Sequence, residues 1–269
     1  MPNNPSVALI ISTYNWPEAL ELVLNSISIQ TLKPNEVIIA DDGSGDDTKL
    51  LIETLQAKLD FPVIHVWHED KGFRLAKIRN LAIAKAKSDY IIQIDGDIII
   101  HPRFIEDHVK FAIQGSFVRA SRIYINQEVS AEMLKNKRFK INAFSKGITN
   151  FFSALRLPFM WRFFDDKYKN SGEERYEIHG CNMAFWRADA IKVNGYNELF
   201  TGWGPEDKEF IARLMNAGVK KRFIKLGALA FHIYHKESQK VSLEANTQTF
   251  KDTIARRFVF TEIGINQYL

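Results

Sequence analysis

Short apolar segments alternate with amphipathic segments through the first 100 residues, and this alternation limits the fold more than any other feature of the chain. The apolar segments are rich in β-branched residues, as strands are; they are SVALIIS, EVIIA, FPVIHVW and YIIQI. The segments between them place apolar residues at helical spacing, as Leu20, Val23 and Leu24 do after Pro17. Apolar strands joined by helices form parallel sheets that are covered on both faces. We therefore predict an α/β fold with a mostly parallel sheet.

Polar stretches follow three of these strands. They are STYN at 12–15, ADDGSGDDT at 40–48 and DGD at 95–97. The second stretch is also a turn that can cap a helix beginning near Thr48. Ligands of such sheets bind beyond the carboxyl ends of the strands. We therefore expect the three stretches to meet at one site.

The second half of the chain is less regular. Its expected elements are a helix at 102–113, a strand at 116–125, a strand at 177–187, a helix ended by Gly218, a strand at 225–235 and a helical tail at 240–269. We expect one continuous domain with three parts: a Rossmann-like nucleotide-sugar half at 1–115, an acceptor-binding half at 116–240 and a tail at 241–269.

The segment 127–176, an insertion in the second half, mixes basic residues with many aromatic rings. The rings are those of Phe139, Phe144, Phe151, Phe152, Phe159, Trp161, Phe163 and Phe164. One interpretation is a lid over the acceptor site with a small core of its own. The other is a peripheral membrane contact through 139–168, in which rings and Lys/Arg together bind an anionic surface. The sequence leaves both open.

Composition narrows the compartment and the partners. A net charge of +4 does not argue for nucleic acid, and we expect none; it suits an anionic small substrate or an anionic membrane surface. The N-terminus lacks the basic start of a signal peptide, and no apolar stretch approaches ~20 residues. Cys181 is the only cysteine, so no intrachain disulfide can form. We expect a cytoplasmic protein, with peripheral contact at the inner face of the plasma membrane as an open alternative.

Asp95 and Asp97 stand one glycine apart at the end of an apolar strand. Paired carboxylates at a strand end form a site for hard cations such as Mg²⁺ or Mn²⁺, particularly where phosphates supply further ligands. The alternative is that one of them only caps a turn, since Asp-Gly is a common turn pair.

Several motifs in register resemble a known family. The three polar stretches, in this order and spacing, resemble the inverting nucleotide-sugar glycosyltransferases of family 2. DKGFRLAKIRN (70–80), HGCNMAFWR (179–187) and GWGPEDKEF (202–210) resemble relatives with a galactosyltransferase-like C-terminal portion. The resemblance runs from about residue 6 to 236. It implies an A-type glycosyltransferase fold, a UDP-sugar donor and a divalent cation, Mn²⁺ or Mg²⁺.

The resemblance also implies donor and metal contacts. Thr13, Tyr14 and Asp42 match the positions that hold uridine, and Arg79 lies near the nucleotide or diphosphate. Asp95 contacts the ribose or the metal. Near the donor sugar the matching residues are Gly180, through its backbone, and Asn182.

The metal shell is completed from a late strand. Asp97 ligates the ion directly, and a histidine after this strand joins it. We favour His232, with His235 as the second candidate. Residues i and i+3 of a strand point to opposite faces, so both can reach one ion only if the strand has ended.

GWGPEDKEF carries the residues implied for the acceptor. Asp207 is the catalytic base, Glu206 binds acceptor hydroxyls and Trp203 offers a flat face to a sugar ring. Acidic residues are also favoured in a first helical turn on electrostatic grounds alone. A helix N-terminus lowers carboxylate pKa values, so we expect proton transfer late in the displacement.

These expectations combine into a metal-dependent inverting transfer of a hexose or N-acetylhexosamine from a UDP-sugar to a hydroxyl of a glycan or lipid-linked acceptor. One alternative is a sugar nucleotidyltransferase, but that class needs a Gly-rich loop after the first strand, and STYNWPEAL has no glycine. A second alternative is a non-catalytic nucleotide-sugar-binding protein.

Overall fold

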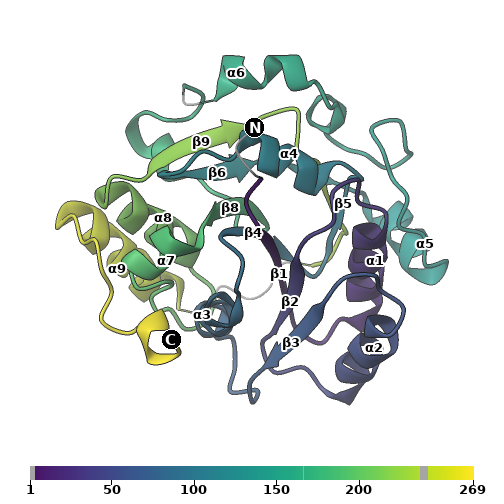
Figure 1. The fold of residues 1–269 in the computed structure, drawn as a ribbon, viewed down its shortest axis with the longest axis horizontal. Coiled ribbons are helices and arrows are strands. Elements are labelled where there is room, and N and C mark those ends of the chain that lie inside the picture. The colour runs from purple at the N-terminus through teal and green to yellow at the C-terminus, as the bar shows by residue number, and fades with distance from the viewer. Residues whose placement is uncertain (1–3, 166, 237–241) are drawn as a thin grey trace.

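A seven-stranded sheet forms the centre of the protein in the computed structural model, which describes residues 4–165, 167–236 and 242–269 (Figure 1). The strand order is β3-β2-β1-β4-β8-β6-β9. The first four positions are parallel, as predicted, whereas β8 runs antiparallel to both β4 and β6. The bounds are β1 Val7–Thr13, β2 Glu36–Asp41, β3 Val63–Trp67, β4 Tyr90–Asp95, β6 Ser116–Ala120, β8 Asn182–Trp186 and β9 Lys220–Ile224.

Helices cover both faces of this sheet because its strands are apolar on both sides. Leu9 and Ile11 of β1 enter one core, and Ala8 and Ile10 enter the other. The first core is closed by α1 (Pro17–Ser28), α2 (Asp46–Gln56) and α4 (Phe104–Phe111), and the second by α3 (Leu75–Lys85), α7 (Arg187–Lys192) and α8 (Glu206–Asn216). The last helix, α9 (Leu243–Ala255), packs on α8.

A second, three-stranded sheet brings a late strand next to the DGD stretch. Its order is β5 (Ile98–Ile100), β10 (Ala230–His232) and β7 (Arg122–Tyr124). In the pairing register His232 lies opposite Ile98 on one side and Tyr124 on the other. The last residue of β10, His232, thereby pairs with Ile98, the residue that follows Asp97 in the chain.

Several predicted elements are wrong in detail. The strand expected at 116–125 is two strands, β6 and β7, which lie in different sheets and separate at Ser121. The strand expected at 225–235 shrinks to the three residues of β10. Strands β5 and β9 were not predicted. The charged residues of β9 do not suggest a strand, but Lys221 is buried there because its amine donates to backbone carbonyls of the segment 169–175. Among the described residues of the tail, 242–269, the helical parts are α9 and a 3-10 turn at Ile265–Gln267.

The aromatic segment 127–176 combines a core with an exposed surface. It consists of α5 (Gln127–Lys135), α6 (Trp161–Phe164) and 3-10 turns at Phe151–Ala154, Pro158–Met160 and Gly172–Tyr176. Val129, Met133, Ile141 and Ala154 form a third core with the small sheet. Four rings remain largely in solvent, with exposed fractions of 74–83%; they belong to Phe144, Phe152, Phe159 and Phe163. Over the described parts of the chain, no helix has the length and apolarity needed to cross a bilayer.

Candidate active site

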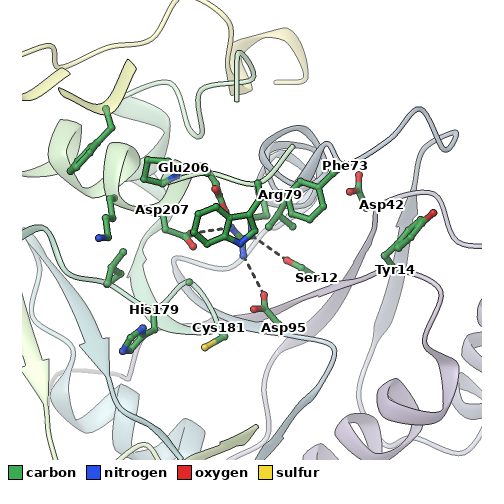
Figure 2. Close-up of a pocket in the computed structure, with 18 of the residues that line it drawn as sticks. Ser12, Tyr14, Asp42, Phe73, Arg79, Asp95, His179, Cys181, Glu206 and Asp207 are labelled. Atoms are coloured by element: carbon green, nitrogen blue, oxygen red, sulfur yellow. Dashed lines mark hydrogen bonds and ion pairs between the residues drawn. The ribbon is translucent and has the colours of Figure 1, made fainter. Parts of the chain in front are cut away.

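A cavity of about 590 Å³ opens at the carboxyl ends of β1, β2 and β4, where the three polar stretches meet (Figure 2). The parallel register explains the convergence, because Thr13 pairs with Asp41, and Ser12 pairs with Asp95. Nine of the residues singled out in the sequence line this cavity; they are Thr13, Tyr14, Asp42, Arg79, Asp95, Gly180, Trp203, Glu206 and Asp207.

The end of the cavity beside β2 is shaped by a fixed turn. Asp42 is buried, and its carboxylate accepts hydrogen bonds from His68 Nε2 at 2.6 Å and from the backbone N–H of Arg74 at 3.0 Å. Gly43 has φ = 100°, and a Cβ there would lie 2.6 Å from the Cα of Asp70, so only glycine fits. His68 was not predicted, and its place directly after β3 is the one sequence signal that marks it. Tyr14, by contrast, is half exposed and donates to Asp70 at 2.9 Å.

Arg79 is the buried centre of the site. Its Nη1 donates to Asp207 Oδ1 at 2.9 Å, its Nη2 to Asp95 Oδ1 at 3.2 Å and its Nε to Ser12 Oγ at 3.2 Å (Figure 2). Glu206 lies 3.6 Å from Nη1. Desolvation opposes the charged form, but the charges of Asp207, Asp95 and Glu206 outweigh it and raise the pKa of Arg79. The side chain of Arg79 is only 1% exposed, so Arg79 is not a solvated charge on the surface of its helix.

One oxygen of Asp207 is held in place by two donors. Oδ1 accepts from Arg79 and lies 3.1 Å from the hydroxyl of Tyr196. Oδ2 lies over the backbone of Gly180, where a Cβ would approach it to 2.0 Å. The absent side chain of Gly180 therefore makes the room that the carboxylate occupies. Tyr196 was not predicted, because nothing in GYNELF marks it as part of a site.

Glu206 and Trp203 complete the wall opposite Asp95. As predicted, Glu206 and Asp207 begin a helix directly after Pro205. Desolvation, together with the charge of Asp207, raises the pKa of Glu206 to about 8, although Arg79 acts against the rise. The rise favours the protonated form of Glu206, which can donate a hydrogen bond. Trp203 is 39% exposed and lines the cavity.

Asp97, His232 and His235 form a cluster whose potential ligand atoms all lie within 4.8 Å of one another. Asp97 Oδ2 is 3.3 Å from Nε2 of His232 and 3.1 Å from Nε2 of His235. We expected one histidine here; both take part, because β10 ends at His232 and the chain then turns. Burial lowers the pKa of His232, whereas the hydrogen bond to Asp97 raises that of His235 to about 9.

The donor set of this cluster fits a divalent ion. One carboxylate and two imidazoles suit a transition metal such as Mn²⁺. Asp97 Oδ1 is buried and has no hydrogen-bond partner among the described residues, as expected of an oxygen reserved for a ligand. Asp95 is not in the cluster, because its Oδ1 accepts from Arg79 within the cavity.

Asn182 does not lie at the cavity. Its side chain is fully buried, where it contacts His108 Nε2 at 3.1 Å and donates to the carbonyls of Ser121 and Ala228. The expected contact of Asn182 with a donor sugar is therefore wrong, and the residue instead joins β8 to the loops between the two sheets. The adjacent Cys181 is buried as well, and desolvation raises the pKa of its thiol, which disfavours the reactive thiolate.

The sheet topology, with its acidic cleft at the strand ends, defines an A-type glycosyltransferase, and comparison with known proteins identifies the family. Residues 8–192 match the family described as glycosyl transferase family 2, and residues 164–236 match the N-terminal domain of galactosyltransferase. The chain belongs to glycosyl transferase family 2, as the resemblance of its motifs indicated.

Similar sequences are found among polysaccharide synthases. The chain is 28% identical to chondroitin synthase of Pasteurella multocida over 243 residues, which are 85% of this chain and 25% of that protein. It is 26% identical to validoxylamine A glucosyltransferase of Streptomyces hygroscopicus subsp. limoneus over 231 residues, 80% of this chain and 49% of that protein. The chain thus spans a quarter to a half of these relatives.

Solved structures share the fold. S. aureus TarS 1-349 in complex with UDP-GlcNAc superposes with a TM-score of 0.67 at 16% identity, over 98% of this chain and 69% of that one. The mannosyltransferase PcManGT from Pyrobaculum calidifontis, in complex with GDP-Man and Mn²⁺, gives 0.63 at 17% identity, over 95% and 65%. Both confirm the A-type fold.

Proposed function

We propose that this glycosyltransferase moves a hexose or N-acetylhexosamine from a UDP-sugar to a hydroxyl group, with inversion at the anomeric carbon. The observation that carries the proposal is the network around Arg79, which joins Asp207, the proposed base, to Asp95 at the end of β4. The metal cluster begins two residues further along the chain, at Asp97. The proposed base and the proposed cation site are thus linked through Asp95 and its neighbours, which supports a single displacement.

Donor binding follows from the fixed turn after β2. The carboxylate of Asp42 is held by His68 and Arg74 at the edge of the cavity, and a carboxylate can accept a hydrogen bond from the N3–H of uracil. The neighbouring Thr13 and Tyr14 flank the same end of the cavity. A UDP-sugar complex of a protein with this fold supports the choice of donor class.

The reaction is one displacement. The acceptor oxygen bonds to the anomeric carbon while the bond from that carbon to the diphosphate breaks, and the acceptor proton passes to Oδ2 of Asp207. Because Oδ1 is fixed by Arg79 and Tyr196, Oδ2 has a defined position before substrate arrives. A divalent ion such as Mn²⁺ or Mg²⁺, held by Asp97, His232 and His235, would neutralise charge on the departing UDP.

Trp203 and the protonated Glu206 are suited to the acceptor. An indole face offers large contact area to a sugar ring, and a protonated carboxyl can donate to a hydroxyl oxygen. We propose a glycan or lipid-linked saccharide as acceptor, which agrees with the polysaccharide synthases among the relatives. In this scheme residues 1–115 bind the donor and residues 116–240 the acceptor.

Exposed rings in the segment 139–168 support peripheral contact with the cytoplasmic face of a membrane. Phe152 and Phe159 are about four-fifths exposed and lie in a segment that also carries Lys140, Lys146 and Arg162. Replacing both rings by serine should reduce co-sedimentation with anionic vesicles while UDP binding is retained. Equal co-sedimentation of the double variant would contradict this contact.

A panel of UDP-sugars incubated with Mn²⁺ tests the proposed function. We expect UDP release from one or a few donors, its loss with EDTA and its loss in Asp207→Asn. A nucleotidyltransferase would instead release pyrophosphate from UTP and a sugar 1-phosphate. A binding protein would bind UDP but release none from any donor. Unchanged turnover with EDTA, or in Asp207→Asn, would refute the metal or the base, respectively.

A further inference from the structure

A second cavity, of about 830 Å³, adjoins the metal cluster on the side away from β2. Arg122 and Trp203 line both this cavity and the first one, so the two are neighbours. The remaining lining residues come from β7, β10 and the chain around them. They are Tyr124, Ile125, Asn126, Gln127, Thr149, His232, Tyr234, His235 and Lys236. No carboxylate is among these described residues, whereas the first cavity is lined by several.

Arg122 carries a charge that no carboxylate in the described parts of the chain neutralises. Its Nη2 contacts the hydroxyl of Tyr124 at 2.6 Å, and its Nη1 lies 3.9 Å from the sulfur of Cys181, a long and weak contact. Its Nε is buried without a hydrogen-bond partner among the described residues. Two other partly buried arginines have carboxylate partners, Arg156 in Asp107 and Arg222 in Asp165. A guanidinium left in this condition is a ready site for an anion.

The positive field of Arg122 reaches its neighbours. Desolvation, together with the charges of Arg119 and Arg122, lowers the pKa of His179 to about 4. The charge of Arg122 also acts against protonation of His232. The wall between the two cavities is therefore electropositive. It lies next to the metal cluster, where the diphosphate would leave in the proposed reaction.

We propose that Arg122 and the second cavity form a subsite for an oxyanion of the substrates, a phosphate or a carboxylate. The inference rests on the proposed function and adds an anionic requirement to it. The planar fork of Arg122 can bind two oxygens of such a group at once. The Arg122 guanidinium overlies the ring of Tyr124, 4.8 Å from its centroid, and Tyr234, 42% exposed in the same cavity, offers a flat face to a sugar ring.

An oxyanion can reach Arg122 from two sources. One is the diphosphate of the donor, since Tyr124 lies edge-on to His232 of the metal cluster with ring centroids 5.9 Å apart. The other is an acidic group on the acceptor, since the second cavity is large enough for a saccharide. The chemistry is shared, and experiment separates the sources.

Calorimetry of the Arg122→Gln variant tests both sources of the oxyanion. The donor arm compares UDP with uridine in the presence of Mn²⁺, and the acceptor arm compares a glucuronate-containing disaccharide with its carboxyl-reduced counterpart. A hydrogen bond to a charged group contributes about 1.5–3 kcal/mol, so we expect the variant to lose about tenfold or more in affinity for one anionic probe and nothing for its neutral counterpart. Arg122→Lys, which keeps the charge without the fork, should lose less.

Arg103→Gln is the matched control, because Arg103 is half exposed, pairs with Glu106 and lines neither cavity. Loss in the donor arm assigns the subsite to the diphosphate, and loss in the acceptor arm assigns it to an acidic acceptor. If folded Arg122→Gln and Arg122→Lys, judged by thermal melting, bind all four probes as the unmodified protein does, the inference is overturned. An equal loss in Arg103→Gln would overturn it too. An unmodified protein that does not bind UDP with Mn²⁺ would instead contradict the proposed function.

Discussion

Gly180→Ala should displace the proposed base without replacing any charged residue. The backbone of Gly180 is not in the left-handed region, so alanine is allowed there by its φ. Its Cβ, however, would lie 2.0 Å from Asp207 Oδ2 and 2.4 Å from Cγ. Ordinary contact begins near 3.4 Å, so the carboxylate and Gly180 must separate by about 1.4 Å.

A displacement of this size has a predictable cost. Misplacing a catalytic group by about 1 Å lowers a rate by about 100-fold, which corresponds to about 2.7 kcal/mol in the barrier. The same movement lengthens the bonds from Arg79 and Tyr196 to Oδ1, now 2.9 and 3.1 Å. We therefore expect kcat for UDP release to fall about 100-fold. UDP affinity should change by less than about threefold, because the turn after β2 is not disturbed.

The assay is the initial rate of UDP release from the best donor of the panel, with UDP affinity measured by calorimetry. Gly45→Ala is the matched control: Gly45 has φ = −75°, and a Cβ there meets only Asn15 Oδ1 at 4.0 Å. It should keep full activity. A folded Gly180→Ala protein with unmodified kcat would show that catalysis does not need the carboxylate where the structure places it.

Three further substitutions test the network around the base. Folding raises the pKa of Glu206, so the folded state binds an extra proton between about pH 4.5 and about pH 8, and the free energy of unfolding falls as the pH rises through this range. Glu206→Gln should make this fall smaller. Urea denaturation at pH 6 and pH 9 measures the difference. Tyr196→Phe should lower the free energy of unfolding by about 1–3 kcal/mol and also lower kcat, since a donor to the carboxylate is lost; unchanged stability and kcat would argue against that bond. Arg79→Met should destabilise the fold by about 3–5 kcal/mol in urea denaturation, because its carboxylate partners lose their counter-charge; a loss below about 1 kcal/mol would contradict this.

The sequence predicted the first half of the fold better than the second for a physical reason. In the first half β1, β2 and most of β4 are buried on both sides and each helix is short, so the periodicity of each segment indicates its structure. In the second half the chain divides its strands between two sheets. The break at Ser121 and the three-residue β10 depend on contacts between distant segments, such as the bonds from Asn182 to Ser121 and Ala228, and no local pattern records these.

The site was predicted in the same uneven way. Its acidic residues follow strand ends or open a helix, and those positions can be read from the sequence. Tyr196 and His68 could not be found in this way, because each acts through a partner elsewhere in the chain, Asp207 and Asp42 respectively. The error with Asn182 has the same origin, since only Cys181 separates it from Gly180 at the cavity and yet its side chain is fully buried.

The charges around Arg79 assign the roles of the two neighbouring acids. One guanidinium faces three carboxyl groups, so the three cannot all be ionised at low cost. The raised pKa of Glu206 favours its protonated form, whereas Asp207 receives two donors on Oδ1, the arrangement typical of a carboxylate. Glu206 is therefore a donor and does not compete with Asp207 for the acceptor proton.

The hydroxyl of Tyr196 allows the network to accept that proton. It lies 3.1 Å from Asp207 Oδ1 and 2.9 Å from Gln93 Oε1, and its single proton can be donated to only one of them. The amide of Gln93 is oriented by the bond from its Nε2 to the carbonyl of Gly180, so Oε1 must face the tyrosine. While Asp207 is ionised the hydroxyl turns toward it, and once Oδ2 has taken the acceptor proton the hydroxyl can turn to Gln93. Both states of the base are thereby hydrogen-bonded without movement of the backbone.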